Sequence, residues 1–197
     1  MTAVALMRHA PSDWNEAGLI QGRADRPLSA AGRALAARWR LPAGLASWRV
    51  FASPLRRTRE TAGAMGLGSV VLEPRLIEMD WGAWSGRSLA GLRAELGTAM
   101  DANEAAGLDF RPEGGESPRE VAARLGAWLA EISAEGGPVV ALTHRGVQRA
   151  ALVLACGWTM LGKPPLRLMR ESMLLLEVDA SGVRLADPAL VPLEHAL

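Results

Sequence analysis

Two of the three histidines in this 197-residue chain closely follow short apolar runs that are typical of buried strands. His9 follows the run 3–7 and His144 follows the run 138–142, each after one intervening polar residue. Ligands of open α/β sheets bind beyond the carboxyl ends of the strands, so we expect both histidines to face one crevice. Imidazole can act as a nucleophile or an acid–base group near neutral pH. Position alone fits a catalytic pair and a pair of structural histidines equally well.

Arginines favour the catalytic interpretation. Arg8 precedes His9, and Arg57 lies in the first turn of a predicted helix that follows another strand. A guanidinium group and the free N–H groups of a helix start both bind phosphate well. The alternative for any one arginine is a solvated surface charge, which we expect for Arg56 and Arg59. The sequence therefore predicts a local anion site that contains two histidines and two arginines.

The elements that would position these residues alternate between strand and helix along the chain. A capping box at Ser117 and Glu120 predicts a helix that starts at Pro118 and buries one face, formed by Val121, Leu125, Trp128, Leu129 and Ile132. This alternation predicts a three-layer α/β/α sandwich with a mostly parallel sheet and an antiparallel edge at its C-terminal end. The expected strands are 3–7, 49–52, 70–72, 138–142, 172–178 and 183–185, and the other expected helices are 29–40, 54–65, 88–107 and 147–156.

Composition limits the class of protein. Hydrophobic residues make up 49% and charged residues 22%, which is the balance of an ordinary globular protein, and we expect a single domain over residues 1–197. A net charge of +1 argues against a general nucleic-acid partner. No apolar run is long enough to cross a bilayer, and the N-terminus lacks a secretory pattern, so we expect no membrane association and a cytoplasmic location. Cys156 is the only cysteine, which excludes an intrachain disulfide, and its apolar surroundings predict burial.

Five ordered motifs between Leu6 and Gly146 resemble those of the histidine phosphatase superfamily, also called the phosphoglycerate mutase-like family, and in particular its small phosphatases. The motifs are Leu6-Met-Arg-His-Ala10 with Asn15, Gln21-Gly-Arg-Ala-Asp25 and Pro27 to Gly32; Ala52 to Arg57 with Thr61-Ala62; Leu76-Ile-Glu78 with Trp81 to Gly86; Gly114 to Ser117; and Thr143-His144 with Gly146.

The resemblance implies a role for each matching side chain. His9 is the implied nucleophile, which carries a phosphohistidine intermediate. Arg8, Arg57 and His144 are implied to surround the phosphoryl group, and Glu78 to protonate the leaving group and then accept a proton from water. No metal and no cofactor are implied. The structural alternative for Glu78 is a loop carboxylate that pairs with an arginine.

The resemblance is less specific around this core. It places Asn15, Gln21 and the backbone of Gly22 along the phosphate and leaving-group side. Ala10 and Arg145 stand where the family usually has glycine, and we expect activity to survive both changes. The third histidine, His195, is expected to be a solvated tail residue. The departures at Ala10 and Arg145 leave every implied catalytic side chain in place.

Three functions share these features. We favour phosphate ester hydrolysis over a mutase reaction because the segment 88–115 leaves modest room for a lid. A non-catalytic module that binds a phosphorylated ligand is disfavoured, because all the implied catalytic side chains are present. The expected partner is a small phosphate ester, and family substrates such as sugar phosphates, phosphoglycerates, nucleotide-related phosphates and α-ribazole phosphate stay open, as does the oligomeric state. Trp14, Trp81 and Trp84 could form an apolar rim for the substrate, although we expect at least two of them in the core.

Overall fold

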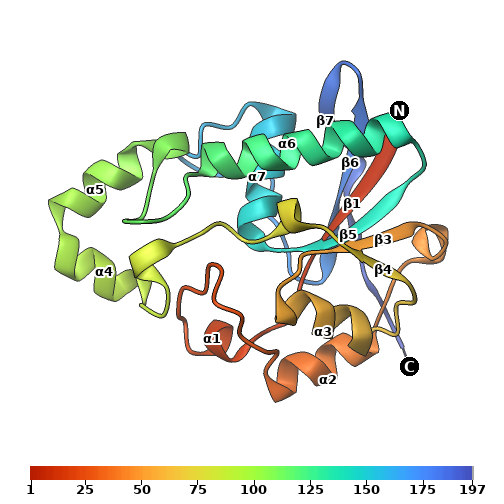
Figure 1. The fold of residues 1–197 in the computed structure, drawn as a ribbon, viewed down its shortest axis with the longest axis horizontal. Coiled ribbons are helices and arrows are strands. Elements are labelled where there is room, and N and C mark those ends of the chain that lie inside the picture. Colours follow the sequence, from red (N-terminus) through yellow and green to blue (C-terminus); the bar gives the residue numbers. More distant parts are fainter. Residues whose placement is uncertain (197) are drawn as a thin grey trace.

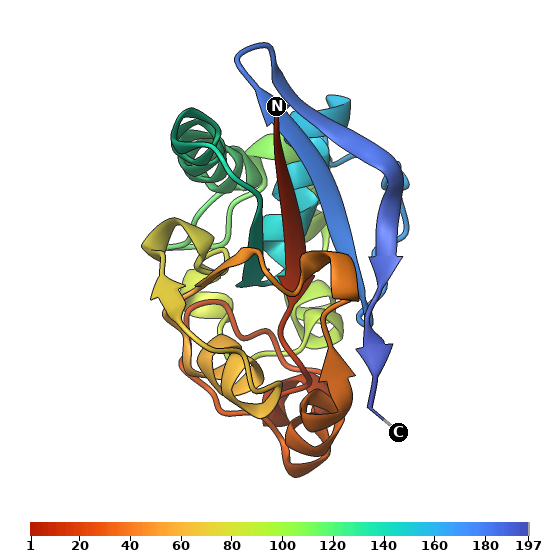
Figure 2. The ribbon, with the colours of Figure 1, turned by 90° about the vertical axis from the view of Figure 1, so that its right-hand side faces the viewer.

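The computed structural model describes residues 1–196 and shows a mixed six-stranded sheet in the order β4-β3-β5-β1-β6-β7 (Figures 1 and 2). The first four strands in this order run parallel, whereas β6 and β7 form an antiparallel hairpin at one edge. This arrangement confirms the predicted sheet. The strands are β1 (Thr2–Arg8), β3 (Arg49–Ala52), β4 (Val70–Leu72), β5 (Val139–Thr143), β6 (Ser172–Asp179) and β7 (Gly182–Pro192).

Helices cover both faces of the sheet, as the three-layer prediction requires (Figure 1). Helices α2 (Ala30–Arg38) and α3 (Arg56–Ala64) lie on one face. Helices α6 (Pro118–Glu135) and α7 (Arg145–Cys156) lie on the other, while α4 and α5 extend beyond the carboxyl ends of the parallel strands. The remaining elements are α1 (Asp13–Glu16), α4 (Leu89–Leu96), α5 (Thr98–Ala105), β2 (Trp39–Arg40), β8 (Glu194–His195) and the 3₁₀ helices η1 (Ala43–Leu45), η2 (Pro74–Leu76), η3 (Gly82–Trp84) and η4 (Gly107–Asp109).

The central strands are buried on both faces because they alternate between two cores. In β1, Val4 and Leu6 pack toward α6 and α7, while Ala5 and Met7 belong to the core on the α2 and α3 side. Period-two alternation of strand side chains explains this division. The predicted apolar face of α6 is confirmed, since all five of its residues are buried. The parallel register of β1 and β5 places the carboxyl ends of both strands at one level.

Several predicted boundaries were wrong. Helix α3 starts at Arg56 rather than at residue 54, with Leu55 as its N-cap. The segment 88–107 contains two helices, because Gly97 adopts a φ of 51° and ends α4 there.

The surroundings of two single residues also differ from the prediction. Cys156 is exposed rather than buried, since it is the last residue of α7. His195 is exposed, as expected, but it lies in β8, which pairs with β2, and its ring lies 3.0 Å from a carboxylate oxygen of Glu171.

Within residues 1–196 no helix combines the length and the apolar character that a membrane span requires.

Candidate active site

The register between β1 and β5 brings the two predicted site histidines together. Arg8 pairs with Thr143 at the ends of these parallel strands, and the His9 N–H donates to the Thr143 carbonyl at 3.1 Å. The next residues are therefore at the same level, and the ring centroids of His9 and His144 lie 5.2 Å apart. Both rings are almost fully buried. The prediction that both histidines lie at one sheet edge is confirmed by this geometry.

The ring of His9 is held in a single tautomer. Its Nδ1 lies 2.6 Å from the Ala10 carbonyl oxygen, which can only accept a hydrogen bond, so Nδ1 carries the proton and Nε2 keeps a free lone pair. The loop is held in turn by the Ala10 N–H, which donates to the Thr61 hydroxyl at 3.0 Å. Burial, and then the charges of Arg57 and Arg8, hold the pKa of His9 well below 6.5. His9 is thus a neutral imidazole with an available nitrogen at neutral pH.

His144 is oriented by two side chains. Arg57 Nε donates to His144 Nδ1 at 3.3 Å, and because Nδ1 accepts, the neutral ring carries its proton on Nε2. Nε2 then donates to the Ser53 hydroxyl at 2.8 Å. Burial and the nearby Arg57 charge hold the pKa of His144 well below 6.5. Sequence reasoning missed Ser53, although it lies in the matching motif directly after β3.

Arg57 reaches the site from the first turn of α3 and is almost completely buried. Besides its bond to His144, its guanidinium donates to the carbonyl oxygens of Ala24 at 2.9 Å and Gly22 at 2.8 Å. These bonds use three of the five N–H groups, so one on each terminal nitrogen stays available for an anion. Burial lowers the pKa of Arg57, while the carboxylates of Glu78 and Asp25 oppose the shift. The loop 22–24 therefore fixes the guanidinium beside both histidines.

Arg8 and Arg170 add positive charge beside His9. Burial, followed by the charge of Arg170, lowers the pKa of Arg8 to about 10. Arg8 Nε is buried and has no hydrogen-bond acceptor among residues 1–196. Arg170 Nη1 donates to the His9 carbonyl at 3.2 Å. Sequence analysis missed Arg170 because it lies outside the recognised motifs, 161 residues from His9 in the chain.

Glu78 approaches the site between η2 and η3 and contacts the start of α7. Its carboxylate accepts from its neighbour Met79 N–H at 2.9 Å and from Gly146 N–H at 3.4 Å. A Cβ atom on residue 146 would lie 2.2 Å from Glu78 Oε1, so only glycine permits this approach. Charge interactions of Glu78 with Arg8, Arg57 and Arg149 place the carboxylate among the site cations.

The three less specific residues occupy different positions. Gln21 is buried, and its Oε1 lacks a hydrogen-bond donor among residues 1–196. The Gly22 carbonyl binds Arg57, so the backbone at this residue positions the guanidinium. Asn15 Oδ1 accepts from the Ser12 N–H at 3.2 Å and so completes a capping box with Ser12, the N-cap of α1, which the sequence did not predict. A direct substrate contact therefore stays a prediction for all three.

A largely apolar cavity of about 410 Å³ is lined by Met79, Gly146 and residues of α4 and α5, with the charged residues Arg93, Glu104 and Arg149 in its wall. Trp81 and Phe110 line it, with ring centroids 5.7 Å apart. Trp84 is buried behind them, whereas Trp14 is half-buried under the guanidinium of Arg26. Of the three tryptophans considered for an apolar rim, Trp81 is the one that lines this cavity.

The two buried histidines should make stability depend on pH. In the unfolded chain both rings have a pKa of about 6.5, whereas the folded protein holds both pKa values lower. Below pH 6.5 the unfolded state therefore binds more protons, and the free energy of unfolding falls as the pH falls, with a limiting slope of about 1.4 kcal/mol per pH unit for each ring. Urea unfolding between about pH 7.5 and pH 5.5 measures this slope. A His9→Gln variant should show a smaller slope, and an unchanged slope would contradict the assignment of His9 as buried and neutral.

Known proteins match the chain over most of its length. A model of the histidine phosphatase superfamily (branch 1) matches residues 4–189. A probable phosphoglycerate mutase GpmB from Enterobacter sp. (strain 638) is 34% identical over 178 residues, which cover 83% of this chain and 77% of that protein. Phosphoserine phosphatase 1 from Hydrogenobacter thermophilus is 33% identical over 162 residues, which cover 76% of this chain and 74% of that protein.

A solved structure agrees with these sequence matches. The mycobacterial glucosyl-3-phosphoglycerate phosphatase, determined in complex with VO3, is similar to this chain with a TM-score of 0.73 and 27% sequence identity. The match covers 93% of this chain and 96% of that chain, and both have the phosphoglycerate mutase-like α/β fold. From the match over residues 4–189, the ordered motifs and this fold, the chain belongs to the histidine phosphatase superfamily, branch 1.

Proposed function

We propose that the chain is a metal-independent phosphomonoester hydrolase that acts through a phosphohistidine on a small phosphorylated metabolite. The observation that carries this proposal is the state of His9. Its Nδ1 is bonded to the Ala10 carbonyl, which leaves Nε2 with a free lone pair, and the charges of Arg57 and Arg8 lie near the neutral ring. A neutral imidazole nitrogen among guanidinium groups is suited to attack a phosphoryl group, whose negative charge the guanidinium groups stabilise.

The reaction has two steps. In the first, His9 Nε2 attacks phosphorus, the bond to the ester oxygen breaks, and Glu78 donates a proton to the leaving alkoxide. In the second, Glu78 accepts a proton from water as the water oxygen attacks the phosphohistidine. The N–P bond then breaks, inorganic phosphate leaves, and both His9 and Glu78 return to their starting states. No other reactant is needed.

The cations would stabilise the transferring group by charge and by position. Arg57 offers the two N–H groups that its bonds leave over within residues 1–196, and Arg8 offers an Nε that has no acceptor there. His144 would contribute its Nε2–H by exchanging the bond to Ser53 for one to a phosphoryl oxygen. Because these donors are already oriented by protein groups, little reorganisation is required when negative charge develops.

Phosphate release from 4-nitrophenyl phosphate in the presence of EDTA tests the proposal. We expect turnover to persist. In a second experiment, a reaction with a ³²P-labelled ester is quenched rapidly without acid, and we expect the protein to retain ³²P. This label should be stable in alkali and labile in acid, as a phosphohistidine is. Turnover that EDTA abolishes, or turnover without a trapped label, would overturn the mechanism. A panel with 3-phosphoglycerate, phosphoserine and α-ribazole phosphate then addresses the natural substrate.

A mutase reaction is the second candidate, because several similar proteins are named as phosphoglycerate mutases or probable phosphoglycerate mutases. In that reaction the phosphoryl group returns from His9 to another hydroxyl of the substrate rather than to water. Incubation with 3-phosphoglycerate, with and without 2,3-bisphosphoglycerate, separates the two. A hydrolase releases phosphate, whereas a mutase forms 2-phosphoglycerate with little phosphate release.

Gly146→Ala should lower kcat about tenfold or more, because the added methyl group would displace the Glu78 carboxylate from its contact with the start of α7. Gly63→Ala on the exposed side of α3 is the matched control, since a Cβ there meets no atom within 4 Å. Steady-state rates and melting temperatures of both variants provide the measurement. A fully active Gly146→Ala variant would argue that the position of Glu78 does not matter for the reaction.

A further inference from the structure

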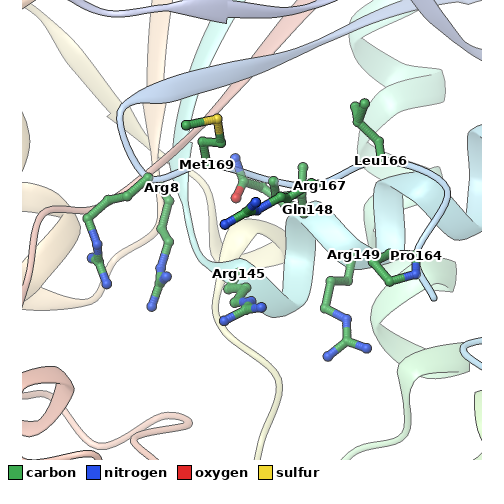
Figure 3. Close-up of a pocket in the computed structure, with 10 residues that line it drawn as sticks. Arg8, Arg145, Gln148, Arg149, Pro164, Leu166, Arg167 and Met169 are labelled. Atoms are coloured by element: carbon green, nitrogen blue, oxygen red, sulfur yellow. The ribbon is translucent and has the colours of Figure 1, made fainter. Parts of the chain in front are cut away.

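A strongly cationic cavity of about 340 Å³ adjoins the site (Figure 3). Its walls come from the end of β1, from one side of α7 and from the segment that joins α7 to β6. Arg145 and Arg149 are one helical turn apart and therefore project from the same side of α7. Five arginines line the cavity: Arg8, Arg145, Arg149, Arg167 and Arg170.

These arginines differ from most others among residues 1–196 because they form no salt bridge, although the charge of Glu78 acts on Arg8 and Arg149 and that of Glu171 on Arg170. Arginines on other surfaces, such as Arg75 and Arg124, form salt bridges with aspartate or glutamate. Among residues 1–196, none of the five cavity arginines lies within 4.0 Å of a carboxylate oxygen. Guanidinium groups that share one cavity repel one another, and a bound anion relieves this repulsion. The charge arrangement is therefore that of an anion-binding site.

The cavity is joined directly to the nucleophile. Arg8 is the residue before His9 and also lines the cavity, with a buried Nε that has no acceptor within residues 1–196. Arg170 lines the same cavity and donates to the His9 carbonyl. Arg145 directly follows His144 and is the first residue of α7. The cavity and the phosphoryl site therefore share one wall, which carries the charges of Arg8, Arg145 and Arg170.

Resting on the proposed function, we propose that the substrate carries a second anionic group, a carboxylate or a second phosphate, which the arginine cavity binds while His9 attacks the phosphoryl group. Charge-assisted bonds from planar guanidinium groups recognise both kinds of oxyanion. Arg145 and Arg167 are exposed and can pair with the anion as it enters, whereas Arg149 and Arg170 are half-buried and would hold it.

Matched substrates separate the second anion from the ester itself. Glycerol 3-phosphate has no second anion, 3-phosphoglycerate replaces its terminal CH₂OH with a carboxylate, and glycerol 1,3-bisphosphate carries a second phosphate. The test variant is Arg145→Gln/Arg167→Gln. Its control is Arg38→Gln/Arg59→Gln, which removes the same charge from exposed positions on α2 and α3 that do not line the cavity.

We expect the wild-type protein to prefer at least one of the two doubly anionic esters over glycerol 3-phosphate by about a hundredfold in kcat/KM. In the test variant, kcat/KM for the preferred doubly anionic ester should fall about tenfold or more, mainly through a higher KM. Its kcat/KM for glycerol 3-phosphate should stay within about threefold of the wild-type value. The control should keep the preference. The better of the two doubly anionic esters distinguishes a carboxylate from a phosphate as the natural second anion.

Three results would overturn the proposal: an equal preference for all three esters, an equal loss with all three in the test variant, or the same selective loss in the control. Calorimetric titration of the same esters into His9→Ala measures binding without turnover. If the cavity binds anions, a doubly anionic ester should bind more tightly than glycerol 3-phosphate even if the protein is not a phosphatase. Absence of that difference refutes the cavity, while absence of turnover refutes only the proposed reaction.

Discussion

Replacing His9 with alanine is expected to lower kcat/KM on the order of a thousandfold or more, because the variant has no nitrogen that can form the phosphohistidine. The surrounding guanidinium groups and His144 keep their own bonds, so the ester should still bind. The loss should therefore appear in kcat rather than in KM. Phosphate release over a range of substrate concentrations gives kcat and KM, and the trapped ³²P label shows whether the phosphohistidine still forms.

His195→Ala is the matched control for this experiment. His195 lies in β8, and its exposed ring pairs with Glu171 and has no hydrogen bond or ion pair to His9, Arg57 or His144 within residues 1–196. The same chemical change there should leave kcat within about twofold, as is usual for a surface substitution. The melting temperature of each variant shows whether the fold is retained. If His9→Ala keeps its fold and continues to turn over, the nucleophile is another group, and the proposed mechanism is wrong.

Arg57→Lys should lower kcat/KM about a hundredfold although it conserves the charge, because the bonds of Arg57 depend on the geometry of its guanidinium. Arg57 binds the carbonyl oxygens of Gly22 and Ala24 and the ring of His144 at the same time. A lysine ammonium group cannot satisfy these three acceptors and also offer two N–H groups to a phosphoryl oxygen. Loss of buried hydrogen bonds should also lower the free energy of unfolding by about 1–3 kcal/mol.

Arg56→Lys provides the comparison within the same helix turn. Arg56 is exposed, and its Nε pairs with Glu60 at 2.6 Å, an interaction that lysine can largely replace. We expect its activity and stability to stay close to those of the wild type. Kinetics and urea unfolding of both variants, measured side by side, give the result. Equal activity in the two variants would show that the site needs only the charge of Arg57 and not its fixed orientation.

The local pattern of residues was sufficient to predict most elements and the core of the site. Short apolar runs between predicted helices located β3 and β4 with the correct bounds, and the capping box at Ser117 located the start of α6. These features depend on neighbouring residues, so a short window of sequence contains them. The motifs around His9 and His144 likewise predicted one shared site, because strand polarity alone places both histidines at the same sheet edge.

Other features were decided by tertiary contacts between segments that are distant in the chain. The approach of Gly146 to Glu78 joins two segments 68 residues apart, and no local pattern indicates that a Cβ atom would clash there. The unpredicted role of Ser53 as the partner of His144 has the same origin.

The arginine cavity shows most clearly which features the sequence predicts and which depend on the tertiary structure. The sequence by itself identified an arginine-rich member of the histidine phosphatase superfamily and predicted a site with His9 and His144 at the carboxyl ends of parallel strands. Only the tertiary structure decided which arginines pair with carboxylates and which gather around one cavity beside His9. Charge interactions depend on distance in space, and the return of the segment before β6 to the end of β1 sets that distance for Arg167 and Arg170.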